Sequence, residues 1–272
     1  MSGGWRFTLR QAPALRVDMR GVSPTALADL SLTEIERLPV GHGNATLALA
    51  EFFKVEADPG GALVFDADLA RFDHVGWQLA GGRMQINGNV GHHAGGCMSA
   101  GELVVAGNAG LLAACEMAGG TLTVEGDVDD FAASTLPGSM DGMRGGLFIV
   151  KGNAGERFAD RMRRGSAIVF GDVGDFAASR LVAGTVAIGG RAGAHVGYGM
   201  RRGTVVLARV QAAPPGPTFV AARGAIDVIW QLLARDLARH GGPFAGLSER
   251  PFERHLGDLA ADGKGELIFA AT

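Results

Sequence analysis

Short apolar segments separated by glycine recur along the chain from about residue 82 to residue 207. Within each segment, apolar and mixed residues alternate over about five positions, as at Leu103 and Val105 or at Val186 and Ile188. A period of two is typical of a strand, because successive side chains of a strand point to opposite faces. The pattern therefore predicts a series of short strands rather than helices in this part of the chain.

The strands belong to a repeat of 19 residues, interrupted once by a seven-residue insertion at 135–141. A glycine precedes each strand, at Gly82, Gly101, Gly120, Gly146, Gly165, Gly184 and Gly203. A second glycine follows all but the last strand, at Gly88, Gly107, Gly126, Gly152, Gly171 and Gly190. An apolar residue ends each unit, at Met98, Met117, Met143, Met162, Leu181 and Met200. Three columns in one register indicate units that stack on one another.

Stacked units of this kind predict an all-β fold, a right-handed parallel β-helix with about 19 residues per coil. Each strand would pair with its equivalent in the next coil, about 4.8 Å away. Glycine suits the corners because it reaches positive φ without the steric cost of a Cβ atom. The expected domains are an N-terminal lead-in and mixed cap (1–60), the β-helix (61–210), and a C-terminal linker, helix and tail (211–272).

One further column supports stacking. The residues after the second glycine are Asn89, Asn108, Asp127, Asn153, Asp172 and Arg191. These residue types tolerate left-handed corners or pair with those that do, and no two carboxylates fall on adjacent coils, where they would repel each other. The methionines and the leucine that end the units are expected to fill the core.

The C-terminal part has a different pattern. Residues 211–218, QAAPPGPT, are predicted to be a linker. Residues 219–241 are predicted to form an amphipathic helix. Its expected apolar face consists of Ile226, Ile229, Trp230, Leu233 and Leu237.

Composition narrows the class of protein. The net charge is -3, which gives no basic excess for nucleic acid, and no apolar run approaches the ~20 residues of a membrane span. The first residues show no secretory signal, so a cytoplasmic location is expected. Glycine makes up 44 of 272 residues, about twice the usual share, and the repeats account for this excess. Two cysteines, Cys97 and Cys115, are too few for a disulfide framework and are expected to be small buried residues.

Sites for chemistry are not evident in the sequence. Gly197, Gly199 and Gly203 miss the spacing of a dinucleotide-binding loop by one residue. His93 and His195 share a column but lie five coils apart, or ~24 Å, too far to share a metal ion. The other histidines, among them His42, His74, His240 and His255, show no ligand spacing. No catalytic, cofactor-binding or metal-binding residue is therefore predicted in this chain.

The iterated pattern G-x-ϕ-x-ϕ-x-G-[ND]-[AV]-G-x6-M resembles the C subunit of formylmethanofuran dehydrogenase and of its bacterial counterpart, the formyltransferase/hydrolase complex. The large subunit of glutamate synthase carries a similar glycine-repeat domain. Residues 32–58, the insertion at 135–141 and residues 253–269 are also similar to the C-subunit family. The chain departs from that family inside the x6 stretch, where alanine replaces a frequent glycine at Ala114, Ala133 and Ala178.

This resemblance implies a non-catalytic scaffold in a hetero-oligomer with hydrolase, formyltransferase and pterin-subunit-like chains. The complex would convert the formyl group of formyl-tetrahydromethanopterin to formate through a methanofuran or methylofuran carrier, with a metal in the hydrolase subunit. Arginine outnumbers lysine 22 to 3, which favours the bacterial complex. The alternatives are the C subunit of a molybdenum or tungsten formylmethanofuran dehydrogenase, and a glycine-repeat domain associated with glutamate synthase.

Arginines gather just before the first glycine of the later units. They are Arg144, Arg163, Arg164, Arg201 and Arg202, with Val182 and Ala183 at the equivalent positions between them. In stacked coils these residues would form one ridge. The ridge is either a solvated charged edge or a contact with an anion, such as an acidic partner surface or the polyglutamyl tail of a methanofuran-type carrier.

Overall fold

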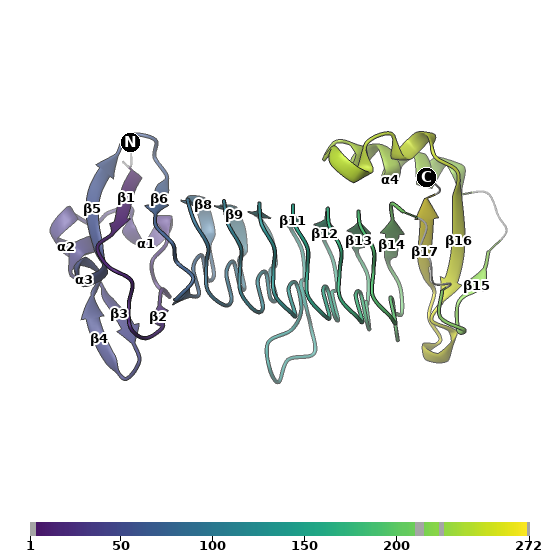
Figure 1. Ribbon diagram of the computed structural model, residues 1–272, viewed down its shortest axis with the longest axis horizontal. Coiled ribbons are helices and arrows are strands. Elements are labelled where there is room, and N and C mark those ends of the chain that lie inside the picture. The colour runs from purple at the N-terminus through teal and green to yellow at the C-terminus, as the bar shows by residue number, and fades with distance from the viewer. Residues whose placement is uncertain (1–3, 210–214, 223–225, 271–272) are drawn as a thin grey trace.

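The computed structural model describes residues 4–209, 215–222 and 226–270. Strands dominate it, helices are few, and a 13-stranded sheet of mixed direction runs through most of the chain, so the predicted all-β class is confirmed. A row of stacked coils lies between an N-terminal cap and a C-terminal hairpin that is accompanied by a helix (Figure 1).

The coils pair through eight parallel strands in register. These are β6 (Leu63–Asp66), β8 (Ala80–Ile86), β9 (Ala100–Val105), β10 (Thr121–Val124), β11 (Leu147–Val150), β12 (Ser166–Val169), β13 (Thr185–Ile188) and β14 (Thr204–Leu207). A second line of parallel bridges joins Leu69, Val90, Ala109, Val128, Ala154, Val173 and Ala192. The insertion at 135–141 leaves this register unchanged and projects from the row as a loop (Figure 1).

One coil begins before the first repeat that the glycine pattern reveals. Strand β6 and the bridge from Leu69 to Val90 form this coil. Its corner glycine, Gly61, has a φ of 70° and aligns with Gly82, but it lies 21 rather than 19 residues before it. His74 and Gln78 hold the left-handed conformation in this coil, with φ of 60° and 53°. The periodic glycines therefore understate the length of the stack.

The N-terminal cap covers one end of the sheet. Strand β1 (Gly4–Leu9) pairs parallel with β6 and antiparallel with β5 (Phe53–Asp58). A four-stranded sheet lies beside them, in the order β4 (Ala45–Ala48), β3 (Pro39–His42), β2 (Val17–Asp18) and β7 (Phe72–Asp73). The helices are α1 (Pro24–Leu27), α2 (Leu32–Glu36) and α3 (Leu49–Phe52). Ser31 and Glu34 form a capping box that begins α2.

The C-terminal tail covers the other end and adds a strand to the stack. Strand β17 (Gly265–Ala270) pairs parallel with β14, and β16 (Phe252–Gly257) pairs antiparallel with β17 and with β15 (Val220–Ala221). Helix α4 (Asp227–Ala238) follows β15, and 3₁₀ turns lie at Gly242–Phe244, Leu247–Glu249 and Leu259–Ala261. Strands of the two terminal segments thus pair with both outer coils, as expected for caps.

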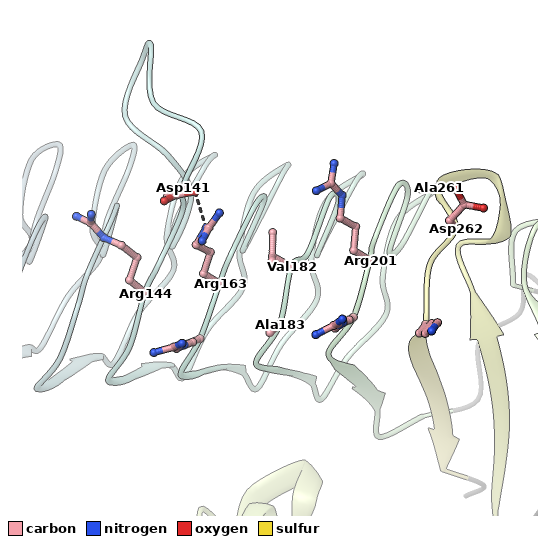
Figure 2. Close-up of a pocket in the computed structure, with 11 residues that line it drawn as sticks. Asp141, Arg144, Arg163, Val182, Ala183, Arg201, Ala261 and Asp262 are labelled. Atoms are coloured by element: carbon pink, nitrogen blue, oxygen red, sulfur yellow. Dashed lines mark ion pairs between the residues drawn. The ribbon is translucent and has the colours of Figure 1, made fainter.

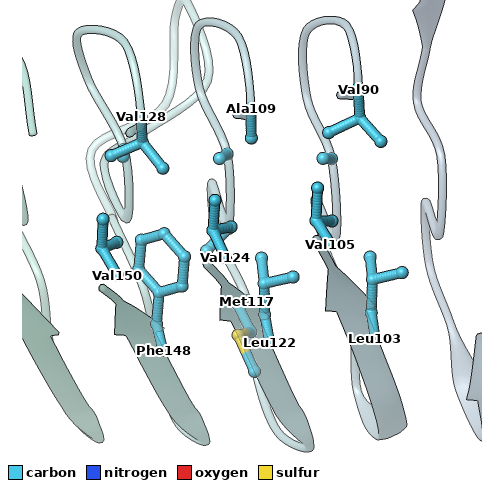
Figure 3. Packing of buried hydrophobic residues seen from close by; sticks show 14 of the residues in the cluster. Val90, Leu103, Val105, Ala109, Met117, Leu122, Val124, Val128, Phe148 and Val150 are labelled. Carbon is cyan, nitrogen blue, oxygen red and sulfur yellow. The ribbon is translucent and has the colours of Figure 1, made fainter. Parts of the chain in front are cut away.

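The core fills the bore of the stack. Leu103, Leu122 and Phe148 point inward from successive strands, and the bridge residues Val90 and Val128 face them (Figure 3). The residues that end the units are fully buried, which confirms their predicted core position: Met98, Met117, Met143, Met162, Leu181 and Met200.

Helix α4 lies over the outer face of the last strands. Trp230, Ala234 and Leu237 pack there against Ile168 and Ala187. The predicted helix was too long at its start, since Val220 and Ala221 belong to a strand. Its predicted face was also partly wrong, because Ile229 is 64% exposed. The predicted linker falls partly outside the described residues, at 211–214.

The first column of glycines holds the corners as predicted. Its members have φ between 77° and 105°, a region that disfavours any residue with a Cβ atom. Glycine occupies the second column for a different reason, because the glycines there do not have a positive φ. A Cβ atom on Gly107 would lie 2.4 Å from Asn89 Oδ1 of the preceding coil. Glycine is needed in this column because neighbouring coils approach closely.

The column after the second glycine forms a hydrogen-bonded ladder. The backbone N–H of each residue donates to the side-chain Oδ1 of its equivalent one coil earlier, at 2.6–2.9 Å from Asn108 through Arg191. The predicted stacking is therefore confirmed. The expected reason was wrong, because none of these residues has a positive φ. Instead, their side chains satisfy backbone donors between coils.

A basic groove at one edge of the coils

The five predicted arginines line a single groove with a volume of about 740 Å³ (Figure 2). Val182 and Ala183 form its middle, between Arg163 and Arg164 on one side and Arg201 and Arg202 on the other. The arginine side chains are all exposed. The structure thus brings together all the residues that the sequence pattern selected.

The coil geometry explains this alignment. Each arginine stands one or two residues before a corner glycine with positive φ. The backbone N–H of Arg163 donates to Met143 O at 2.7 Å, and that of Arg201 donates to Leu181 O at 2.7 Å. The same bond in successive coils sets the side chains in a row along the stack, spaced by the distance between paired strands, about 4.8 Å.

The C-terminal tail adds a sixth cation, Lys264, which the repeat pattern did not reveal. Its backbone N–H donates to Arg201 O at 2.7 Å, so the tail continues the row by one coil. A signal was present in the sequence: GELIF at 265–269 matches GELVV at 101–105, and Lys264 holds the position before this glycine.

Counter-ions are distributed unevenly along the groove. Arg144 pairs with Glu116 at 3.2 Å, and Arg163 Nε lies 2.5 Å from Asp141 Oδ1. Within the described part of the chain, four of the six cations form no ion pair: Arg164, Arg201, Arg202 and Lys264. Only two of the described carboxylates line the groove, so it carries an excess of positive charge toward the C-terminal cap.

Guanidinium groups in such a row are chemically suited to anions. They present planar sets of N–H donors that match carboxylate and phosphate oxygens. Among the residues that the structure describes, no group of three or more His, Cys, Asp or Glu side chains is arranged to hold a metal ion. Burial raises the pKa of both the Cys97 and the Cys115 thiols, which disfavours the reactive thiolate.

A second cluster of titratable groups lies at the N-terminal end of the coils. The rings of His74 and His93 stack at 4.7 Å, and Trp77 meets His74 edge-on. His74 Nδ1 lies 3.1 Å from Asp18 Oδ1, and Arg20 pairs with the same carboxylate. The sequence contains a signal that groups these histidines, because His74 and His93 lie 19 residues apart, which is the length of one repeat. The repeat pattern, which begins at Gly82, did not include His74.

Lowering the pH from about 7.5 to 5.5 is expected to destabilise the folded chain through these two histidines. Burial lowers the pKa of both, and the Asp18 carboxylate only partly opposes this effect at His74. The unfolded chain therefore takes up protons first, below about pH 6.5. The stability contributed by the neutral rings is present above that pH and lost below it.

Urea midpoints measured across this pH range check the prediction. A variant with His74→Gln and His93→Gln should show a weaker pH dependence than the wild type. An unchanged dependence would assign the effect to other groups, such as His240, whose pKa burial also lowers.

Known proteins resemble parts of the sequence. No family model matches the chain. It is 41% identical over 76 residues to the Fhc C subunit of the formyltransferase/hydrolase complex of Methylorubrum extorquens. It is 31% identical over 89 residues to the C subunit of tungsten-containing formylmethanofuran dehydrogenase 2 of Methanothermobacter wolfeii. These alignments span 28% and 31% of this chain, and 29% and 33% of the relatives' own lengths.

The structural likeness is more extensive. A chain in the crystal structure of the formyltransferase/hydrolase complex (FhcABCD) from Methylorubrum extorquens, in complex with methylofuran, matches with a TM-score of 0.91. The two are 39% identical, and the match covers 98% of this chain and all of the other. No helix in the described residues has the length and apolar character to cross a membrane. The chain belongs to the family formed by the C subunits of formyltransferase/hydrolase complexes and formylmethanofuran dehydrogenases.

Proposed function

We propose that the chain is the C subunit of a formyltransferase/hydrolase complex, where it serves as a non-catalytic member of a hetero-oligomer. The likeness over 98% of the chain to a component of such a complex supports this assignment. The higher identity to the bacterial protein than to the tungsten enzyme favours the hydrolase complex over the dehydrogenase. In this proposal the metal, the one-carbon carrier and tetrahydromethanopterin serve the catalytic subunits.

The role in the complex is that of a scaffold built on a right-handed parallel β-helix. In-register pairing from β6 to β14 and the ladder of Asn and Asp side chains support a rigid rod. Both end coils are paired with strands of the caps, which leaves the long sides of the rod for contacts with partners. A rod of this kind holds two catalytic subunits at a constant distance.

The groove is the contact for a carboxylate-rich chain, the polyglutamyl tail of a methanofuran-type carrier. The observation that carries this assignment is the row of six cations, four of them without an ion pair in the described residues. A merely solvated edge gains nothing from placing like charges side by side, because they repel one another. A chain of carboxylates would relieve this repulsion and form charge-assisted hydrogen bonds.

Replacing Arg163, Arg164, Arg201 and Arg202 with glutamine is expected to reduce retention of methylofuran by the purified complex roughly tenfold or more at low salt. The difference from the wild type should shrink as salt rises, because salt screens the lost attraction. Complex assembly, followed by size-exclusion chromatography, should be unaffected.

A matched control changes four exposed arginines outside the groove: Arg10, Arg37, Arg235 and Arg239 to glutamine. This variant has the same net charge as the first and should retain the carrier normally. Loss of assembly in the groove variant alone would identify an acidic partner surface as the ligand instead. Equal behaviour of both variants and the wild type would reduce the groove to a solvated edge.

A further inference from the structure

The insertion at 135–141 delivers a carboxylate to the groove. Asp141, its last residue, lies against Arg163 (Figure 2). The other acid among the described residues that line the groove, Asp262, forms no ion pair with a described cation. The insertion that breaks the 19-residue period between Gly120 and Gly146 therefore neutralises one cation of the row.

We propose that Asp141 is a specificity-determining residue of the groove, an internal carboxylate that a long bound polycarboxylate chain has to replace at Arg163. This inference rests on the proposed function of the groove as a carboxylate site. It goes further because it assigns a role to the insertion and predicts which ligands that role affects.

The length of the ligand determines whether Asp141 affects its binding. Arg201, Arg202 and Lys264 lie together at the C-terminal end of the groove, while Arg163 lies two coils away, or about 9.6 Å. A short anion can bind at the C-terminal end without meeting Asp141. A longer chain that crosses Val182 and Ala183 meets a carboxylate already in place on Arg163. Asp141 thus weakens the binding of long chains and leaves that of short ones unchanged.

The base of the insertion does not depend on Asp141. Leu136 N donates to Glu116 Oε1 at 3.2 Å, and Gly142 N donates to Arg161 O at 3.0 Å. Met143 N donates to Ala133 O at 3.0 Å. These bonds remain in an Asp141→Asn variant, so the loss of the carboxylate can be tested without loss of the loop.

The test measures binding of fluorescently labelled hexaglutamate and diglutamate to the full-length chain by anisotropy at low salt. Asp141→Asn should tighten the binding of hexaglutamate about two- to fivefold, the gain expected when one exposed competing ion pair is removed. Its affinity for diglutamate should stay within experimental error of the wild type. Asp262→Asn, which makes the same charge change in the same groove, should give a clearly smaller gain with hexaglutamate.

The outcomes separate the two proposals. Equal gains for Asp141→Asn and Asp262→Asn would mean that only net charge matters, and the role of Asp141 would be refuted. Binding of hexaglutamate by the wild type with no gain in Asp141→Asn would also refute it, while the groove would remain a carboxylate site. Absence of hexaglutamate binding in all three proteins would refute the groove function itself.

Discussion

Replacing Gly165 with valine is expected to lower the free energy of unfolding by about 3–5 kcal/mol. Gly165 has a φ of 94°, which a β-branched residue adopts only with strain. A Cβ atom there would also lie 2.7 Å from Gly146 O and 2.9 Å from Gly145 C. Both contacts are with backbone of the neighbouring coil, which cannot move aside without opening the stack.

Gly138→Val provides a control that separates strain from crowding. Gly138 has a similar φ of 86°, but it lies in the exposed insertion and nothing approaches its Cβ position within 4 Å. This variant should lose only about 1–2 kcal/mol, the cost of the left-handed conformation. Urea unfolding followed by circular dichroism measures both. Equal losses would show that coil contacts add nothing at Gly165.

Replacing Asp160 with alanine is expected to cost about 2–4 kcal/mol. Asp160 is only 3% exposed and accepts hydrogen bonds from Ser179 Oγ at 2.6 Å and from Arg180 Nε at 2.9 Å. Its removal leaves the buried Ser179 hydroxyl and part of a guanidinium without a partner. The Arg180 side chain is 39% exposed, so water replaces some of the lost interaction and keeps the cost below that of a fully buried pair.

Asp236→Ala on helix α4 is the matched control. Asp236 pairs with Arg239 at 3.4 Å, with both side chains mostly exposed, so its loss should cost less than about 1 kcal/mol. The two variants can be compared by their urea midpoints in the same buffer. If Asp160→Ala is no less stable than Asp236→Ala, the buried pair does not stabilise the stack.

Features that recur at a fixed period were the ones that could be predicted from the sequence. Corner glycines, core methionines and the arginine row each depend on a local requirement that every coil repeats. The first coil and β17 were not predicted from the sequence, because each lacks one of the two glycines that mark a coil. Lys264 reaches the groove from a segment 62 residues beyond Arg202, a contact that only the pairing of β14 with β17 creates.

The backbone conformation of the turns between strands could not be predicted from the sequence either. Ala114, Ala133 and Ala178 have φ of 55–58°, and Phe131, Arg157 and Phe176 are likewise left-handed. Residue propensity predicts none of this, because these types avoid positive φ in isolation. Packing between coils imposes the conformation.

The regular stacking of the coils fixes the distance between the two caps in equal steps. Because equivalent residues pair one coil apart, the separation of the two caps can change only by whole coils, each about 4.8 Å. Deletion of residues 165–183 would remove one complete coil, join Arg164 to Gly184 and keep every column in register. The same deletion would place the Arg163–Arg164 pair and the Arg201–Arg202 pair on neighbouring coils. A change in length that is not a multiple of 19 residues would have to be accommodated in a loop, as the insertion at 135–141 is, or the strands would lose their register.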